Sequence, residues 1–72
     1  MAEFFKDIPI GSKFRAIDYG TIVMKLSDTS EYFNNYPLQE RPTNCIILED
    51  INGNSINRQT VCGNEVLCEI IN

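Results

Sequence analysis

The alternation of apolar and polar residues is clearest between residues 21 and 27 of this chain. A period of two with β-branched residues is typical of a half-buried strand. Val23 alone breaks the alternation. We expect the strand to turn one set of side chains toward the core and the other toward solvent: Ile22, Met24 and Leu26 inward, and Thr21, Lys25 and Ser27 outward.

The same reasoning predicts four more strands, and residues typical of turns separate them. Gly20 closes a three-residue hairpin connection at 18–20, because such hairpins need a residue at positive φ. The Asn-Gly-Asn triplet at 52–54 is a second, strong hairpin signal. The further strands are predicted at 13–17, 44–50, 55–58 and 65–71.

The remaining segments carry turn and loop signals. Residues 28–43 contain two asparagines, two prolines and no sustained periodicity, so we expect an irregular loop. This loop is long compared with the usual connection of about 4–6 residues. Residues 1–7 are predicted to form a short helical turn whose Phe4 and Phe5 rings cap the core, and residues 59–63 a single 3₁₀ turn.

These elements predict a mainly β fold in a single small domain over residues 1–72. We expect a five-stranded antiparallel sheet that curls into a small barrel or roll, with at most one short helical turn. The order of hairpin, long loop, distal hairpin, 3₁₀ turn and closing strand is similar to that of a Src-homology-3-like barrel. A roll with one flanking helical turn is the alternative.

Charge and composition narrow the class of partner. The net charge of −4 disfavours nonspecific binding to a nucleic-acid backbone, which depends on cations displacing counterions. No apolar run approaches the roughly 20 residues that span a bilayer. The first residues lack the basic start and apolar middle of a secretory signal. We therefore expect a cytoplasmic protein with no membrane partner.

The three cysteines and the absence of histidine bear on chemistry. Cys45, Cys62 and Cys68 have no metal-site spacing and are odd in number, so we expect reduced thiols in or near the core. No Ser-His or Cys-His pair, phosphate-binding loop or metal-ligand cluster is present. A chain of this size has little room for a ligand pocket of about 300–1,000 Å³. We expect no enzyme activity, no metal and no cofactor.

Aromatic residues supply the candidate binding surface. Tyrosine and arginine are enriched at the energetic centres of interfaces and also stack on nucleobases. For Phe33 we favour a role as a lid on the core. The candidate contacts lie in the long loop and at a hairpin tip: Tyr19, Tyr32, Phe33, Tyr36 and Arg41.

A second candidate site is a local anion site. Arg15, Lys25 and Arg58 converge on one face if their strands are neighbours. Ordinary surface charge is the favoured alternative. For Lys25 in particular, we expect a solvated cation that protects the sheet from edge-to-edge association.

Two stretches form a recognisable pattern: Phe5-x-x-Ile8-Pro9-Ile10-Gly11-x-x-Phe14 and the Lys25-Leu26-Ser27 strand that follows. This pattern resembles one in small phage-encoded β-barrel proteins. The resemblance covers about the first 27 residues and implies a phage origin. It also implies inhibition or modification of host machinery. It carries no functional residue across, because the motif is a glycine turn feeding a strand.

Together these features favour a non-enzymatic binding protein that blocks a host protein, such as a component of a CRISPR or other antiviral defence. The alternatives are an oligomeric sponge for a small nucleotide signal and a nucleic-acid-associated small barrel. The last strand is apolar on both faces, which predicts a homodimer. Coverage of its second face by Phe4 and Phe5 within one subunit is the competing explanation.

Overall fold

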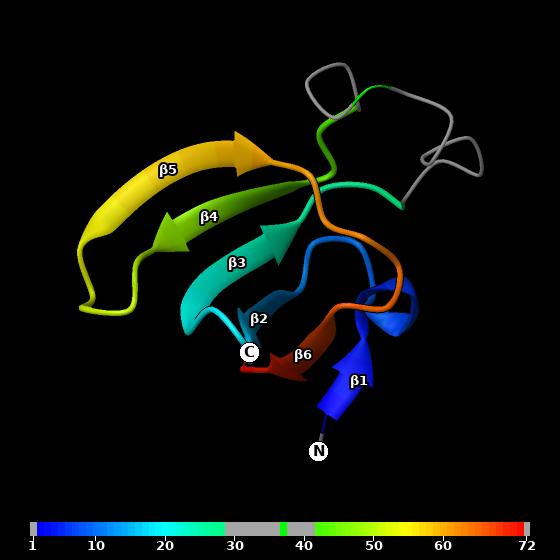
Figure 1. The fold of residues 1–72 in the computed structure, drawn as a ribbon, viewed down its shortest axis with the longest axis horizontal. Coiled ribbons are helices and arrows are strands. Elements are labelled where there is room, and N and C mark those ends of the chain that lie inside the picture. Colours follow the sequence, from blue (N-terminus) through cyan, green and yellow to red (C-terminus); the bar gives the residue numbers. More distant parts are fainter. Residues whose placement is uncertain (1, 29–36, 38–41, 72) are drawn as a thin grey trace.

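Six antiparallel strands form one curved sheet in the order β1-β6-β2-β3-β4-β5 (Figure 1). The structure is a computed structural model, and it describes residues 2–28, 37 and 42–71. Within these residues the one helical element is a 3₁₀ turn, η1 (Phe5–Asp7). The strands are β1 (Ala2–Phe4), β2 (Lys13–Ala16), β3 (Thr21–Lys25), β4 (Cys45–Glu49), β5 (Ser55–Thr60) and β6 (Leu67–Ile70).

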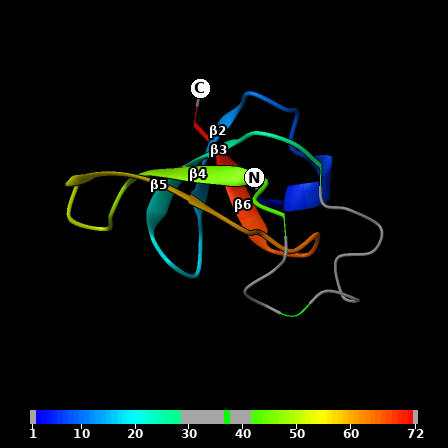
Figure 2. The same cartoon turned by 90° about the horizontal axis from the view of Figure 1, so that it is seen from above.

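The sheet bends around the core without closing. Figure 1 shows β5 and β4 toward one end of the sheet and β6 and β1 toward the other, and from above β6 passes under β4 (Figure 2). Its two edge strands, β1 and β5, do not pair with each other in the described part of the chain. The predicted mainly β, antiparallel class is confirmed, but within the described residues the sheet has six strands rather than the five of the predicted barrel or roll, and it does not close.

The sixth strand explains the difference from the prediction. Residues 2–4 extend along β6 with Ala2 opposite Glu69 and Phe4 opposite Leu67, so they occupy an edge that the prediction left free. The predicted helical turn at the N-terminus is limited to η1. Within the described residues, no helix is long and apolar enough to cross a membrane.

Both predicted hairpins form. Gly20 adopts φ 72°, and a Cβ at this position would lie 2.9 Å from the Ile51 side chain, so the β2–β3 turn requires glycine. In the β4–β5 turn, Gly53 adopts φ 85° and the Asp50 carboxylate accepts hydrogen bonds from the backbone N–H groups of Asn52 and Asn54. A glycine at positive φ therefore shapes each turn, and the Asp50 hydrogen bonds add to the β4–β5 turn.

The predicted 3₁₀ turn at 59–63 is wrong. β5 continues to Thr60, which pairs with Cys45 on β4. Residues 61–63 then run as an irregular segment toward β6. Continued pairing of β5 with β4 is favoured over the predicted 3₁₀ turn, because it satisfies backbone groups that the turn would leave unpaired.

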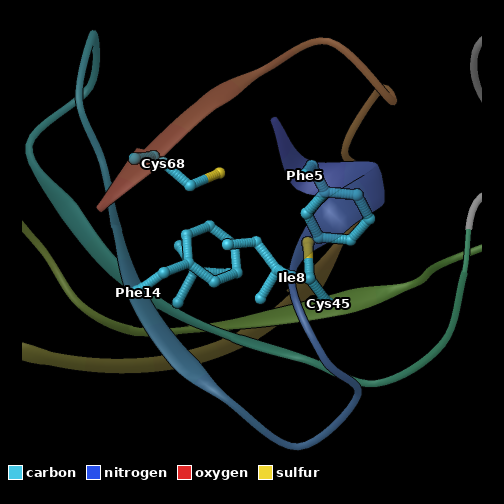
Figure 3. Close-up of a cluster of buried hydrophobic side chains, with 7 residues drawn as sticks. Phe5, Ile8, Phe14, Cys45 and Cys68 are labelled. Atoms are coloured by element: carbon cyan, nitrogen blue, oxygen red, sulfur yellow. The ribbon is translucent and has the colours of Figure 1, made fainter. Parts of the chain in front are cut away.

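The core lies on the concave face of the sheet, and the prediction of which β3 residues face it is reversed. Phe14 pairs with Val23, and both are buried. Ile22 and Met24 therefore lie on the convex face, where they are half-buried, and Leu26 is exposed. Figure 3 shows several of these core side chains pointing toward one another: Phe5, Ile8, Phe14, Cys45 and Cys68.

Lys25 is buried, not solvated as predicted. Its Nζ donates hydrogen bonds to the carbonyl oxygens of Phe5, at 3.0 Å, and Ile8, at 2.8 Å. It also lies 2.8 Å from a carboxylate oxygen of Asp28. The ammonium has three donors, and these three partners satisfy them, which makes the buried charge tolerable.

The last strand, β6, lies inside the sheet between β1 and β2, so both its edges are paired. Phe5 turns into the core and meets Phe14 edge to face, with ring centroids 5.7 Å apart. Phe4 stays on the outer face opposite Leu67, where both side chains are about 40% exposed. The two phenylalanines therefore divide between the two faces; the homodimer remains a prediction.

Candidate functional site

A cleft of about 360 Å³ opens on the concave face of the sheet. This volume lies near the lower end of the range of about 300–1,000 Å³ that is typical of ligand pockets, so the chain has room for a small one. The floor comes from β2, β3 and β4, the wall from the segment that leads to β6, and Tyr19 and Thr21 complete the lining. The floor residues are Phe14, Ala16, Val23, Cys45 and Ile47, and the wall residues are 60–63 and Val66.

Strand register explains why the floor is apolar. Phe14 on β2, Val23 on β3 and Ile47 on β4 are successive cross-strand partners. Partners of this kind share a face of the sheet, so the three side chains form one apolar row. The row continues to Arg58 on the edge strand β5, which is exposed. A cation therefore ends the apolar row at the free edge of the sheet.

A buried asparagine holds the wall in place. The Asn44 side-chain amide donates to the Cys62 carbonyl oxygen, and the Cys62 N–H donates to Asn44 Oδ1, both at 2.8 Å. The Asn44 side chain thus replaces a backbone partner for Cys62 just beyond the end of β5. Nothing in the sequence pattern distinguished Asn44, because an asparagine before an apolar run reads only as the start of a strand.

Two of the three cysteines line the cleft, Cys45 and Cys62. The predicted placement in or near the core is confirmed for all three, because Cys45 and Cys68 are buried and Cys62 is half-buried and packs against the core. The Cys45 Sγ lies 3.6 Å from the Thr60 carbonyl oxygen, and the Cys68 Sγ lies 3.3 Å from that of Val66. Both are weak S–H donors to backbone acceptors.

Burial and mutual contact shift the acidity of these thiols. Burial raises the pKa of Cys68 to about 11. A hydrogen bond between the side chains of Cys62 and Cys45 raises the pKa of Cys62 and lowers that of Cys45, because a Cys45 thiolate would accept the Cys62 proton. In the described part of the chain, no cluster of His, Cys, Asp and Glu is arranged to hold a metal ion.

Of the predicted aromatic and loop contacts, Tyr19 lines the cleft from the β2–β3 turn and is 67% exposed. It is thus available to a ligand while it borders an apolar floor. The other four predicted contacts lie outside the described residues: Tyr32, Phe33, Tyr36 and Arg41.

The structure does not bring the three predicted anion contacts together. Arg15 lies on the convex face opposite Ile22, and its guanidinium is 3.4 Å from the Glu69 carboxylate. Lys25 points into the core on the opposite face of the sheet. Of these three residues, Arg58 alone is exposed on the concave side. The predicted convergence is wrong because Arg15 and Lys25 occupy positions of opposite parity in their paired strands.

The chain has no match among protein-family models, curated proteins or solved structures. What the cleft does must therefore be argued from its side chains. Among the described residues its lining combines apolar groups, three hydroxyls and two thiols, with no carboxylate. Such a lining favours burial of an apolar group with polar contacts at the border.

Proposed function

We propose that the protein is a non-enzymatic binding protein whose cleft receives an apolar side chain of a partner protein. The observation that carries the proposal is the apolar row formed by Phe14, Val23 and Ile47 at the floor of a 360 Å³ cleft. Burying one large apolar side chain contributes about 1.5–3 kcal/mol. A few such anchors supply most of the affinity in a protein–protein interface.

Tyr19, which lines the cleft, and Arg58, which lies on the same face of the sheet at its edge, support the same function. Tyr19 and Arg58 are exposed on the concave side, and both residue types are enriched among energetically dominant interface residues. The partner is therefore expected to offer an apolar anchor with an acceptor or carboxylate beside it, which Arg58 would bind. The acidic balance of the chain argues against a nucleic-acid partner.

The biological setting is a proposal that rests on the sequence resemblance. The phage-like segment at 5–14 supports a phage accessory protein that acts on a host protein in the bacterial cytoplasm, such as a component of a CRISPR or other antiviral defence. The strand order β6-β2-β3-β4-β5 supports a Src-homology-3-like arrangement, to which β1 adds an edge. Small β folds host many functions, so the proposal rests on the cleft rather than on the strand order.

A matched pair of substitutions on β3 tests the function. Thr21 lines the cleft, and its neighbour Ile22 lies on the opposite face. Thr21→Phe places a ring in the cleft, and Ile22→Phe adds a ring to the convex face. Immobilised wild type and both variants are used to capture proteins from bacterial lysate, after thermal melting has shown that each variant is folded.

We expect a protein that wild type and Ile22→Phe retain and Thr21→Phe does not. The loss should be at least about tenfold in retained amount, since about 1.4 kcal/mol of anchor burial corresponds to that factor. Equal retention by all three proteins, or loss only with Ile22→Phe, contradicts binding in the cleft.

A small nucleotide is the second candidate ligand, because the Tyr19 ring borders the cleft and Arg58 lies on the same side. The ring would stack on the base and the guanidinium would bind phosphate. In this case a second copy of the chain would complete the site. Thermal shift with a nucleotide panel tests this, since a ligand at 100 times its Kd adds about 2.7 kcal/mol of stability.

A further inference from the structure

Two cysteines that meet across the cleft form a second candidate site, which is independent of what the cleft binds. Cys45 begins β4, and Cys62 lies in the wall just beyond the end of β5. Both line the cleft, and their side chains are hydrogen-bonded to each other. Cys45 pairs with Thr60, and Cys62 lies two residues further along the chain, beyond the end of β5.

The backbone of Cys62 is held where a bond to Cys45 can form. The Asn44 amide makes two hydrogen bonds of 2.8 Å with the Cys62 backbone, and Asn44 directly precedes Cys45. A disulfide joins residues whose Cα atoms lie about 4.4–6.8 Å apart. Any approach that the bond requires falls on residues 61–63, which lie outside the strand ladder.

The third thiol is placed differently. The Cys68 side chain is fully buried near Phe14 (Figure 3), and its sulfur lies 3.3 Å from the Val66 carbonyl oxygen. Cys45 is also almost fully buried, at 1% exposure, so Cys62 is the least buried of the three cysteines. A reagent that enters the cleft therefore meets Cys62 first.

We propose that Cys45 and Cys62 form a reversible disulfide by exchange with a small disulfide that enters the cleft. The Cys62 thiolate attacks one sulfur of the small disulfide, which forms a mixed disulfide and releases one small thiolate. The Cys45 thiolate then attacks the Cys62 sulfur, which forms the protein disulfide and releases the second small thiolate. Both protein protons pass to the released thiolates, so the protein loses two electrons and the small disulfide gains them.

The local acidity sets the pace of this exchange. The pKa of Cys62 is raised by its hydrogen bond to Cys45 and by burial, so little Cys62 thiolate exists at neutral pH. The first step is therefore slow at neutral pH and accelerates as the pH rises. The finished bond ties the cleft wall to β4 and replaces two thiols in the lining by one disulfide.

The test uses the full chain, reduced and then equilibrated with glutathione buffers from fully reduced to fully oxidised. Free thiols are alkylated, and intact mass and peptide mapping locate the bond. We expect an intramolecular species, lighter by two hydrogens, that links Cys45 to Cys62 and leaves Cys68 alkylated. Cys68→Ser should form the same bond, and Cys62→Ser should form no intramolecular disulfide.

Three results would overturn the proposal: free thiols throughout in fully oxidised glutathione, an intramolecular bond that includes Cys68, or a mixed disulfide that never resolves. The mapping of the wild-type protein decides among these even if a variant fails to fold. A formation rate that does not increase between neutral and mildly alkaline pH would contradict attack by Cys62.

Discussion

The ammonium of Lys25 lies 4.6 Å from the centre of the Phe5 ring and donates a hydrogen bond to the Phe5 carbonyl oxygen, 3.0 Å away. A second bond, of 2.8 Å, reaches the carbonyl oxygen of Ile8. One side chain on β3 therefore fixes the segment that carries η1 over the core. The cation also faces the aromatic ring, an arrangement that contributes more when it is removed from water.

Lys25→Met should lower the free energy of unfolding by about 1–3 kcal/mol, the usual cost of leaving a buried polar group without its partner. The Ile8 carbonyl loses the Lys25 donor, whereas the Phe5 carbonyl keeps the Ile8 N–H at 3.1 Å. Urea unfolding measures the change. A midpoint equal to that of wild type would show that the buried ammonium is not needed.

Asp28→Asn is the matched control for this site. The Asp28 side chain is 72% exposed, and asparagine keeps an oxygen that can accept from Lys25. Exposed ion pairs contribute about 0–1 kcal/mol, so the control should cost less than Lys25→Met. The reverse order would place the stabilisation in the ion pair rather than in the carbonyl contacts.

Adjacent phenylalanines should differ sharply in their contribution to stability. Phe5 is fully buried and meets Phe14, so Phe5→Ala should cost about 3–5 kcal/mol. Phe4 is 39% exposed on the outer face, so Phe4→Ala should cost about 1 kcal/mol. Similar losses in thermal melts of the two variants would contradict the division of the rings between the two faces.

The alternation of β3 predicts that Met24→Ala is among the most damaging changes. The structure predicts instead that the loss in free energy of unfolding is smaller than the about 2–5 kcal/mol that a buried methionine costs. Met24 is half-buried on the convex face. Val23→Ser should be worse, because it places a hydroxyl in the core beside Phe14. Urea midpoints in the opposite order would restore the face that the sequence predicts.

The β4–β5 turn should contribute stability that depends on pH. Hydrogen bonds from Asn54 hold the pKa of Asp50 below its ordinary value, and the bond from the Asn54 backbone has a larger effect than the bond from its side chain. A carboxyl whose pKa is lowered by folding stabilises the fold above its unfolded pKa of about 3.9 and loses that effect as pH falls through the folded value. Asp50→Asn should therefore lower the urea midpoint at neutral pH, and the gap should close in acid. A gap that persists in acid would assign the effect to something other than ionisation.

Local patterns predicted the elements that local contacts stabilise. Gly20 and Gly53 located both hairpins because positive φ is a local requirement. The prediction of which β3 residues face the core was reversed, because the burial of Lys25 depends on carbonyl oxygens of Phe5 and Ile8, 20 and 17 positions away. No alternation in the strand itself can report such partners. β1 was missed for a similar reason, since three residues become a strand only when the edge of β6 is available.

The candidate site could be predicted only in part. Tyr19 was identified because an exposed tyrosine at a hairpin tip is a frequent contact residue. The cleft itself depends on the curvature of the sheet and on Asn44, which holds Cys62 and the wall segment opposite the floor. Neither follows from the local sequence, because both arise from pairing between distant segments.

The most direct test of binding in the cleft is a methyl NMR spectrum of the labelled protein, recorded with and without the partner that wild type retains. Val23 and Ile47 place methyl groups in the cleft, and their neighbours Met24 and Ile46 place theirs on the convex face. The account predicts that the Val23 and Ile47 resonances shift on binding while those of Met24 and Ile46 stay in place. Shifts confined to Met24 and Ile46 would contradict it and place the interface on the other side of the sheet.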